Sequence, residues 1–261
     1  MRVMNATRIL QIFFILISLT SPKLAQNQVT ELSKDEKRAV AAAENGVKLV
    51  KAGRHKEAAG EFELAIRLNP GFAVAFNDLG VTYNSLSRYE DAIKVLTTAL
   101  RLSPDYADAY YNLGVAFDKL RQSRQAINAY EDAVRIKPSF VHAYIGLGAV
   151  YEHDGHYERA ITFYREAIRI DPNDAEAYNN LGTAQAKSGH YEEASQSFEE
   201  SIRLNPNLTE AHYNLGVLSL RAKRREIAFR QYTVLTSLNS PLAARLYNGI
   251  YQGKILFVVV K

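Results

Sequence analysis

The chain contains no cysteine among its 261 residues. Disulfide bonds and metal sites with cysteine ligands are therefore excluded, and the absence is compatible with either a reducing or an oxidising compartment. The sequence also lacks a glycine-rich phosphate-binding loop and a Gly-x-Ser-x-Gly turn, the motifs that would point to nucleotide chemistry or to a serine nucleophile. We therefore predict no enzyme, no catalytic residues and no cofactor.

An excess of charge of one sign is also lacking. The chain has 32 Lys and Arg against 28 Asp and Glu, a formal net charge of +4. Arg2, Arg8 and Lys23 lie in a segment without acidic residues that reads as a leader, and without these three the balance is 29 to 28. Nucleic-acid-binding proteins gather Lys and Arg against phosphates, so we expect no nucleic-acid partner.

No apolar run reaches the roughly 20 residues that an ordinary membrane-spanning helix needs. The run Ile9–Leu19 covers about 11 residues, with Arg2 and Arg8 in front of it and small polar residues behind it. This pattern predicts a secretory signal peptide over residues 1–26 and a protein that is exported, either to the periplasm or out of the cell. The alternative is an uncleaved N-terminal anchor, which would then be the one membrane contact.

Proline is scarce, yet five of the seven prolines stand exactly one 34-residue period apart, at Pro70, Pro104, Pro138, Pro172 and Pro206. Repetition at this period is typical of a stacked helical array rather than of one globular core.

Each period holds two amphipathic helices. In residues 141–174, large residues recur at steps of three and four in two successive segments, and Gly155 and His156 interrupt the pattern between them. Two short helices joined by a tight turn form a helical hairpin. Gly148 in the first helix and Ala160 in the second are small residues where the two backbones would approach closely.

These residues resemble the tetratricopeptide repeat (TPR) family, whose pattern runs Leu-Gly, aromatic, Ala, aromatic, Ala, Pro. The Leu-Gly pair stands at Leu79-Gly80, Leu113-Gly114, Leu147-Gly148, Leu181-Gly182 and Leu215-Gly216, with Asn45-Gly46 as a weaker first copy. The first Ala of the second helix stands at Ala58, Ala92, Ala126, Ala160, Ala194 and Ala228. The resemblance implies an all-α fold, a right-handed α-solenoid of antiparallel helix pairs whose first helices line a concave groove.

Six repeats are predicted, at residues 39–72, 73–106, 107–140, 141–174, 175–208 and 209–242. Residues 27–38 connect the leader to the first repeat, and Ser33 with Glu36 forms a capping box that should begin the first helix. Residues 243–261 are predicted to be a capping helix and an apolar tail. The helix should run from Pro241 to about Tyr251, and the β-branched run Ile255–Val260 does not belong to the repeat.

Candidate peptide-binding residues follow from the groove that the resemblance implies, because residues flanking each Leu-Gly pair and not used for packing should face it. No metal ligands are among them, since His153 and His156 near Glu152 and Asp154 are better explained as turn residues. The candidates are Asn77, Asp78, Asp108, Tyr111, Asn112, Glu176, Asn179, Asn180, Tyr213 and Asn214.

Three of these candidates, Asn112, Asn180 and Asn214, share the position two residues before the glycine and form what we call the asparagine column. An asparagine amide both donates and accepts, so a column of amides can pair with the backbone of an extended peptide whatever its side chains. This column resembles the asparagine ladder of the TPR enzyme that attaches N-acetylglucosamine to proteins, although Asp78 and Gly146 interrupt it here. The alternative is that each asparagine bonds to the neighbouring repeat.

A second precedent, the carboxylate clamp of chaperone-binding TPR proteins, needs Lys or Arg where Asp108 and Asn112 stand, and it is not predicted. The sequence thus predicts a non-enzymatic module that binds protein or peptide segments, an adaptor or assembly factor of the cell envelope. The alternative is a structural scaffold that oligomerises through its convex face or its C-terminal tail.

Overall fold

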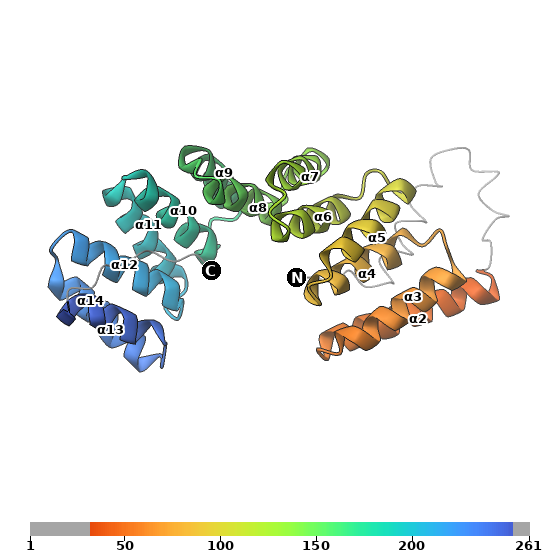
Figure 1. Cartoon of the computed structure of the whole chain (residues 1–261), viewed down its shortest axis with the longest axis horizontal. Helices are drawn as coiled ribbons and strands as arrows, with labels where there is room; N and C mark the ends of the chain where they lie inside the picture. Colours follow the sequence, from red (N-terminus) through yellow and green to blue (C-terminus); the bar gives the residue numbers. More distant parts are fainter. Residues whose placement is uncertain (1–31, 253–261) are drawn as a thin grey trace, which may run out of the picture. The chain divides into compact units, whose positions relative to one another are not determined.

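The structure is a computed structural model that describes residues 32–252, and it is helical there, without β-strands (Figure 1). The predicted leader and the tail Ile255–Val260 lie outside the described residues. The helices are α2 (Lys34–Lys51), α3 (His55–Leu68), α4 (Ala73–Ser85), α5 (Tyr89–Leu102), α6 (Ala107–Lys119), α7 (Ser123–Ile136), α8 (Val141–His153), α9 (Tyr157–Ile170), α10 (Ala175–Ser188), α11 (Tyr191–Leu204), α12 (Thr209–Arg221), α13 (Arg225–Ser237) and α14 (Leu242–Gln252).

The described chain forms two compact units, and their border falls between α6 and α7, inside the third predicted repeat. In residues 32–122, α2 packs against α3 and α4 packs against α5, each pair as a hairpin, and α6 follows against α4 and α5 (Figure 1). In residues 123–252, α7 packs against α8, the pairs α8/α9, α10/α11 and α12/α13 form hairpins, and α14 packs on α12 and α13.

The turn inside each repeat is built on one residue with a left-handed backbone. The backbone N–H of the residue that follows it donates to the carbonyl five residues earlier, as from Arg88 to Tyr83 and from His156 to Tyr151, both at 2.8 Å. Such a bond closes a helix end in the Schellman manner. Ser87 and Arg121 adopt this conformation although they are not glycine. The left-handed residues are Gly53, Ser87, Arg121, Gly155, Gly189 and Lys223, one period apart.

The two helices of a repeat approach closely because a glycine on the first meets a large side chain on the second. A Cβ built on Gly148 would lie 2.5 Å from Tyr164 Cε1, and one on Gly182 would lie 2.7 Å from Phe198 Cε1. Both distances are shorter than van der Waals contact, so only glycine fits. The same pairing joins Gly46 with Phe62 and Gly80 with Leu96.

The first alanine of each second helix lies at the same interfaces. All six of these side chains are fully buried, which fits their predicted role as small residues between helix backbones. They are Ala58, Ala92, Ala126, Ala160, Ala194 and Ala228.

The sixth repeat departs from this arrangement. A Cβ on Gly216 would meet Leu246 of α14, 2.6 Å away, rather than the large residue of its own second helix, Tyr232. Tyr232 instead lies beside Phe229 and Tyr247, with ring centroids 5.9 and 5.8 Å away. The capping helix predicted from the sequence, here α14, therefore supplies the contact that a second helix supplies elsewhere.

Polar contacts fix the helix ends and join neighbouring helices. The predicted capping box is confirmed, because Glu36 N–H donates to Ser33 Oγ at 3.2 Å while Ser33 N–H donates to Glu36 Oε2 at 2.8 Å. These bonds hold the pKa of Glu36 below its ordinary value.

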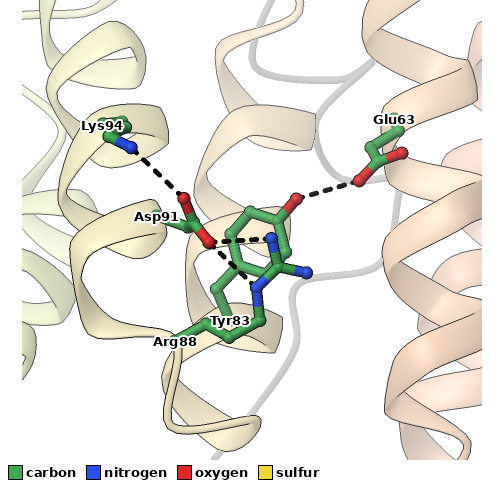
Figure 2. A network of polar contacts seen from close by, with 5 residues as sticks. All are labelled: Glu63, Tyr83, Arg88, Asp91 and Lys94. Atoms are coloured by element: carbon green, nitrogen blue, oxygen red, sulfur yellow. Dashed lines mark hydrogen bonds and ion pairs between the residues drawn. The ribbon is translucent and has the colours of Figure 1, made fainter.

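Figure 2 shows a second network, across α3, α4 and α5. The Tyr83 hydroxyl donates to Glu63 Oε1 at 2.9 Å, and the Arg88 guanidinium lies 4.2 Å from the centre of the Tyr83 ring. Arg88 also donates to Asp91 at 2.8 Å, and Lys94 Nζ lies 3.4 Å from the same carboxylate. The ion pairs are exposed and contribute little, whereas the tyrosine bond joins two repeats.

The glycine contact makes a first prediction. Gly148→Ala places a methyl group against the Tyr164 ring, so the free energy of unfolding should fall by about 1–3 kcal/mol. Gly60→Ala is the control, because Gly60 is an exposed helical residue with nothing within 4 Å of its Cβ position, and it should gain about 0.5–1 kcal/mol. Urea unfolding followed by circular dichroism measures both, and a Gly148→Ala variant as stable as the wild type would contradict the packing described.

Candidate functional site

The ten predicted site residues all lie on first helices of repeats. Two of them, Asn77 and Asp78, lie on α4 in the first unit, residues 32–122. The other eight lie on α6 of that unit and on α10 and α12 of the second unit, residues 123–252. A residue two positions before a helical glycine lies about 200° around the helix from it, so the asparagine column points away from the second helix of its own repeat. The remaining residues are Asp108, Tyr111 and Asn112 on α6, Glu176, Asn179 and Asn180 on α10, and Tyr213 and Asn214 on α12.

Amides join neighbouring repeats in the first unit. Asn112 Nδ2 donates to Asn77 Oδ1 at 2.9 Å, and Asn77 Nδ2 donates to Asp78 Oδ1 at 3.2 Å. Asn84, at the far end of α4, donates to the backbone carbonyl of Asn112 at 2.9 Å. Asn112 therefore makes the bond to a neighbouring repeat that the second interpretation of the column describes.

The carboxyl group of Asp78 lies in a partly buried, negatively charged surrounding. Burial raises the pKa of Asp78 to about 7, the bond from Asn77 opposes that rise, and the charge of Asp108 adds to it. Burial and then the charges of Asp78 and Asp108 raise the pKa of Tyr106 as well. Burial alone raises the pKa of Tyr111. A positively charged group on this face would therefore be stabilised.

The second unit has the same pairing of amides, but between residues that are fully buried. Asn214 Nδ2 donates to Asn179 Oδ1 at 2.9 Å, and Thr183 Oγ1 donates to the carbonyl of Asn179 at 2.9 Å. Asn179 and Asn214 are both fully buried, as is Tyr213, which lies under the guanidinium of Arg245 at 4.9 Å. These three predicted site residues pack between helices and are out of a ligand's reach in this structure.

Asn180 is the exception in the column. It is 8% exposed, and its side-chain oxygen accepts no hydrogen bond. In Asn112 and Asn214 the side-chain nitrogen donates to an asparagine 35 residues earlier, but at the matching place for Asn180 stands Ile145, which offers no acceptor. The next residue, Gly146, has no side chain, and Tyr130 of α7 fills the space there, 2.6 Å from a built Cβ.

The polar residues around His153 and His156 are predicted to be turn residues rather than metal ligands, and one of them, Glu152, bonds between helices. Glu152 is buried, and its carboxylate accepts from Lys187 Nζ at 2.7 Å and from the Tyr164 hydroxyl at 3.0 Å. The ion pair links α8 with α10. His153 and His156 are exposed, and within residues 32–252 no three His, Cys, Asp or Glu side chains are grouped as metal ligands.

Between residues 32 and 252, none of the helices combines the length and the apolar character needed to cross a bilayer.

Comparison with known families rests on the repeats themselves. The family model of the TPR repeat matches residues 82–120 and 153–189, and that of the tetratricopeptide repeat matches residues 107–140 and 175–208. The chain is a tetratricopeptide repeat protein. The resemblance predicted from the Leu-Gly pairs and the proline period is thus confirmed, and so is the all-α fold of consecutive helix pairs. TPR proteins are generally non-catalytic modules that bind protein or peptide partners.

Several solved TPR structures are similar to this one. The MamA protein is 27% identical with a TM-score of 0.57, over 65% of this chain and 93% of its own. YrrB, a TPR protein with an unusual peptide-binding site, is 23% identical with a TM-score of 0.54, over 71% and 92%. PilF of Pseudomonas aeruginosa is 17% identical with a TM-score of 0.71, over 83% and 99%. The last two share the fold alone. Comparison with curated protein sequences gives no match.

The sequence analysis did not identify the residues that bond to the asparagine column, which are Asn77 and Asn179. The signal was present, because Asn77 and Asn112 are 35 residues apart, as are Asn179 and Asn214. An asparagine in the column and another one position earlier in the preceding repeat therefore mark a bonded pair. Asn180 lacks such a partner in the sequence as well.

The raised pKa of Asp78 makes a second prediction. The folded chain holds this proton more tightly than the unfolded chain, so ionisation between about pH 4 and pH 7 lowers the free energy of unfolding. Asp78→Asn removes that cost and should stabilise the protein by roughly 2–4 kcal/mol at pH 8, and much less at pH 4.

Urea unfolding at both pH values measures this difference, with Asp105→Asn in the exposed turn before α6 as the control. The control should change stability by less than about 0.5 kcal/mol at either pH. An Asp78→Asn variant whose advantage is the same at pH 4 and pH 8 would show that the carboxyl group is not titrating near neutrality.

Proposed function

We propose that this TPR protein binds extended segments of other proteins on the face formed by the first helices of its repeats, as a non-enzymatic adaptor or assembly factor. The observation that carries the proposal is the unused acceptor of Asn180. A buried amide oxygen without a hydrogen bond is costly, and a backbone N–H of a bound segment would satisfy it once the side chains that cover this oxygen move aside. Asn180 points away from α11, the helix that packs behind α10.

The residues around Asn180 have different roles in the proposed binding. Glu176 lies one helical turn earlier on the same face and is exposed, so it is placed to select the charge of a ligand side chain. Asn179 and Asn214 are bonded to each other beneath the surface. They hold α10 and α12 in register, and thus position Asn180 rather than touch the ligand.

The first unit offers a second patch of the same kind. Asp78, Asp108, Tyr111 and Asn112 are all partly exposed, with Asn77 bonded behind them. Two carboxylates beside a tyrosine favour a segment that carries Lys or Arg. Binding at either patch uses side chains and hydrogen bonds alone, and turnover of a substrate by the purified chain would contradict this function.

The proposal places the protein in the cell envelope. Its support is the N-terminal segment, in which two arginines precede a short apolar run. The protein is exported to the periplasm or secreted, with an uncleaved anchor as the alternative. Cell fractionation followed by N-terminal sequencing of the mature chain separates these outcomes.

A third prediction tests the binding face. Asn180→Ala should weaken binding of a client segment by about two- to tenfold, the equivalent of one net hydrogen bond of 0.5–1.5 kcal/mol, without lowering stability. Clients are captured from the envelope fraction with wild-type protein, and the captured segment is then titrated against each variant by fluorescence anisotropy.

Asn128→Ala is the matched control, since Asn128 is an exposed asparagine of α7, and it should bind like the wild type. Equal affinities for wild type and Asn180→Ala would show that Asn180 takes no part in recognition. If a variant carrying Asn180→Ala, Glu176→Gln and Asp78→Asn captures clients as well as the wild type, then binding does not use this face.

A further inference from the structure

Helices α13 and α14 leave an aromatic face open to solvent. Phe229, Tyr247 and Tyr251 are 46%, 41% and 52% exposed, whereas most large apolar side chains of the described chain are covered. Their rings form a continuous row through Tyr232, in which neighbouring centroids lie 5.9, 5.8 and 4.6 Å apart. We call these four residues the aromatic row.

The repeat period shows what this face lacks. Tyr213 and Val217 stand one period before Tyr247 and Tyr251, and they are only 0% and 9% exposed. They are buried because α13 and α14 pack over α12, through residues such as Ala228 and Leu246. Helix α14 occupies the place of a first helix in the next repeat, and in residues 32–252 no second helix lies over it. The row is therefore the surface that a further helix would cover.

A hollow of about 410 Å³ lies between α13 and α14, beside the row. It is lined by Arg225, Glu226, Phe229, Arg230, Ile250 and Tyr251, from both helices. The Arg225 guanidinium donates to the carbonyl of Ile250 at 2.6 Å, which fixes one wall of the hollow to the other.

The segment that carries the row has an excess of basic residues. Residues 221–252 hold six Lys and Arg and a single acid, Glu226. In the first two repeats, the arginine before the second helix is paired three residues on, Arg54 with Glu57 and Arg88 with Asp91. The sixth repeat has Ile227 in the place of that acid. Within the described chain, the side chains of Arg224 and Arg230 pair with no carboxylate.

We propose that the aromatic row binds an amphipathic helix of another protein, with aliphatic or aromatic residues on one side and Asp or Glu along its edge. A helix fits because helices cover the equivalent face in the preceding repeats. Acidic edges fit because Arg230, which lines the hollow, has no carboxylate partner within the described chain. A second copy docked symmetrically would bring the same cations of both chains together, which opposes such a dimer. This surface is separate from Asn180 and does not depend on the peptide face.

The chain itself supplies a probe of this chemistry. A fluorescein-labelled peptide with the sequence of α11, residues 191–204, carries four Glu and one Arg and is a second helix of a repeat. A hydrocarbon staple on its outward face holds it helical. Titrated with the full-length protein, this peptide should bind, and the version with all four Glu changed to Gln should bind at least tenfold more weakly.

Variants of the protein locate the site. Arg230→Glu, and Tyr247→Ser combined with Tyr251→Ser, should each weaken binding of the acidic peptide at least tenfold. All three are exposed, so the fold should survive, which circular dichroism checks. Arg165→Glu is the matched control, an exposed arginine on α9, and it should change the affinity less than twofold. Equal binding to wild type and Arg230→Glu, or no binding at about 1 mM protein, overturns the proposal.

Three further results would also overturn it by naming another occupant. Vesicles of phosphatidylserine and phosphatidylcholine that bind the wild type but not Arg230→Glu, while the peptide fails, would assign the face to a membrane surface. A mass that doubles with concentration and is reduced by the tyrosine changes would assign it to a second copy. Peptide binding that tightens tenfold when residues 254–261 are removed would assign it to the chain's own tail.

Discussion

The contact between a helical glycine and one large side chain of the next helix determines the rest of the structure. Where Gly148 meets Tyr164, the tyrosine ring packs directly on the glycine and leaves no room for a side chain at residue 148. In the first, second, fourth and fifth repeats, the first helix therefore turns the same side toward its partner. Residues two positions before the glycine then lie on the opposite side, away from the second helix.

A fixed position does not imply a fixed role. Asn214 and Asn180 occupy equivalent places one period apart, yet Asn214 bonds to Asn179 in the preceding repeat and Asn180 has no such partner. At residue 145 an isoleucine stands in place of the asparagine that accepts this bond in the other pairs, so the Asn180 nitrogen has no such acceptor there. The buried oxygen of Asn180, a separate group, also accepts no hydrogen bond.

The period of the sequence was sufficient to predict the helix pairs, since each pair depends on residues within one repeat. Features that depend on two repeats were not predictable in the same way. The burial of Tyr213 and the exposure of Tyr247 follow only from what packs over each, although both are tyrosines at one repeat position. The raised pKa of Asp78 likewise depends first on its burial in the fold, with a smaller contribution from the charge of Asp108, 30 residues later.

The two ends of the described array differ in how they meet solvent. At the start, α2 begins with a capping box and turns charged residues outward, so its exposed side needs no cover. At the other end, α14 keeps tyrosines at the positions that pack inside the array, while Ile227 replaces the acid that pairs with arginine in the first two repeats. Exposed apolar patches with charged residues beside them are typical of interaction sites. The retained rings and the unpaired cations together describe a surface suited to an acidic helix rather than to water.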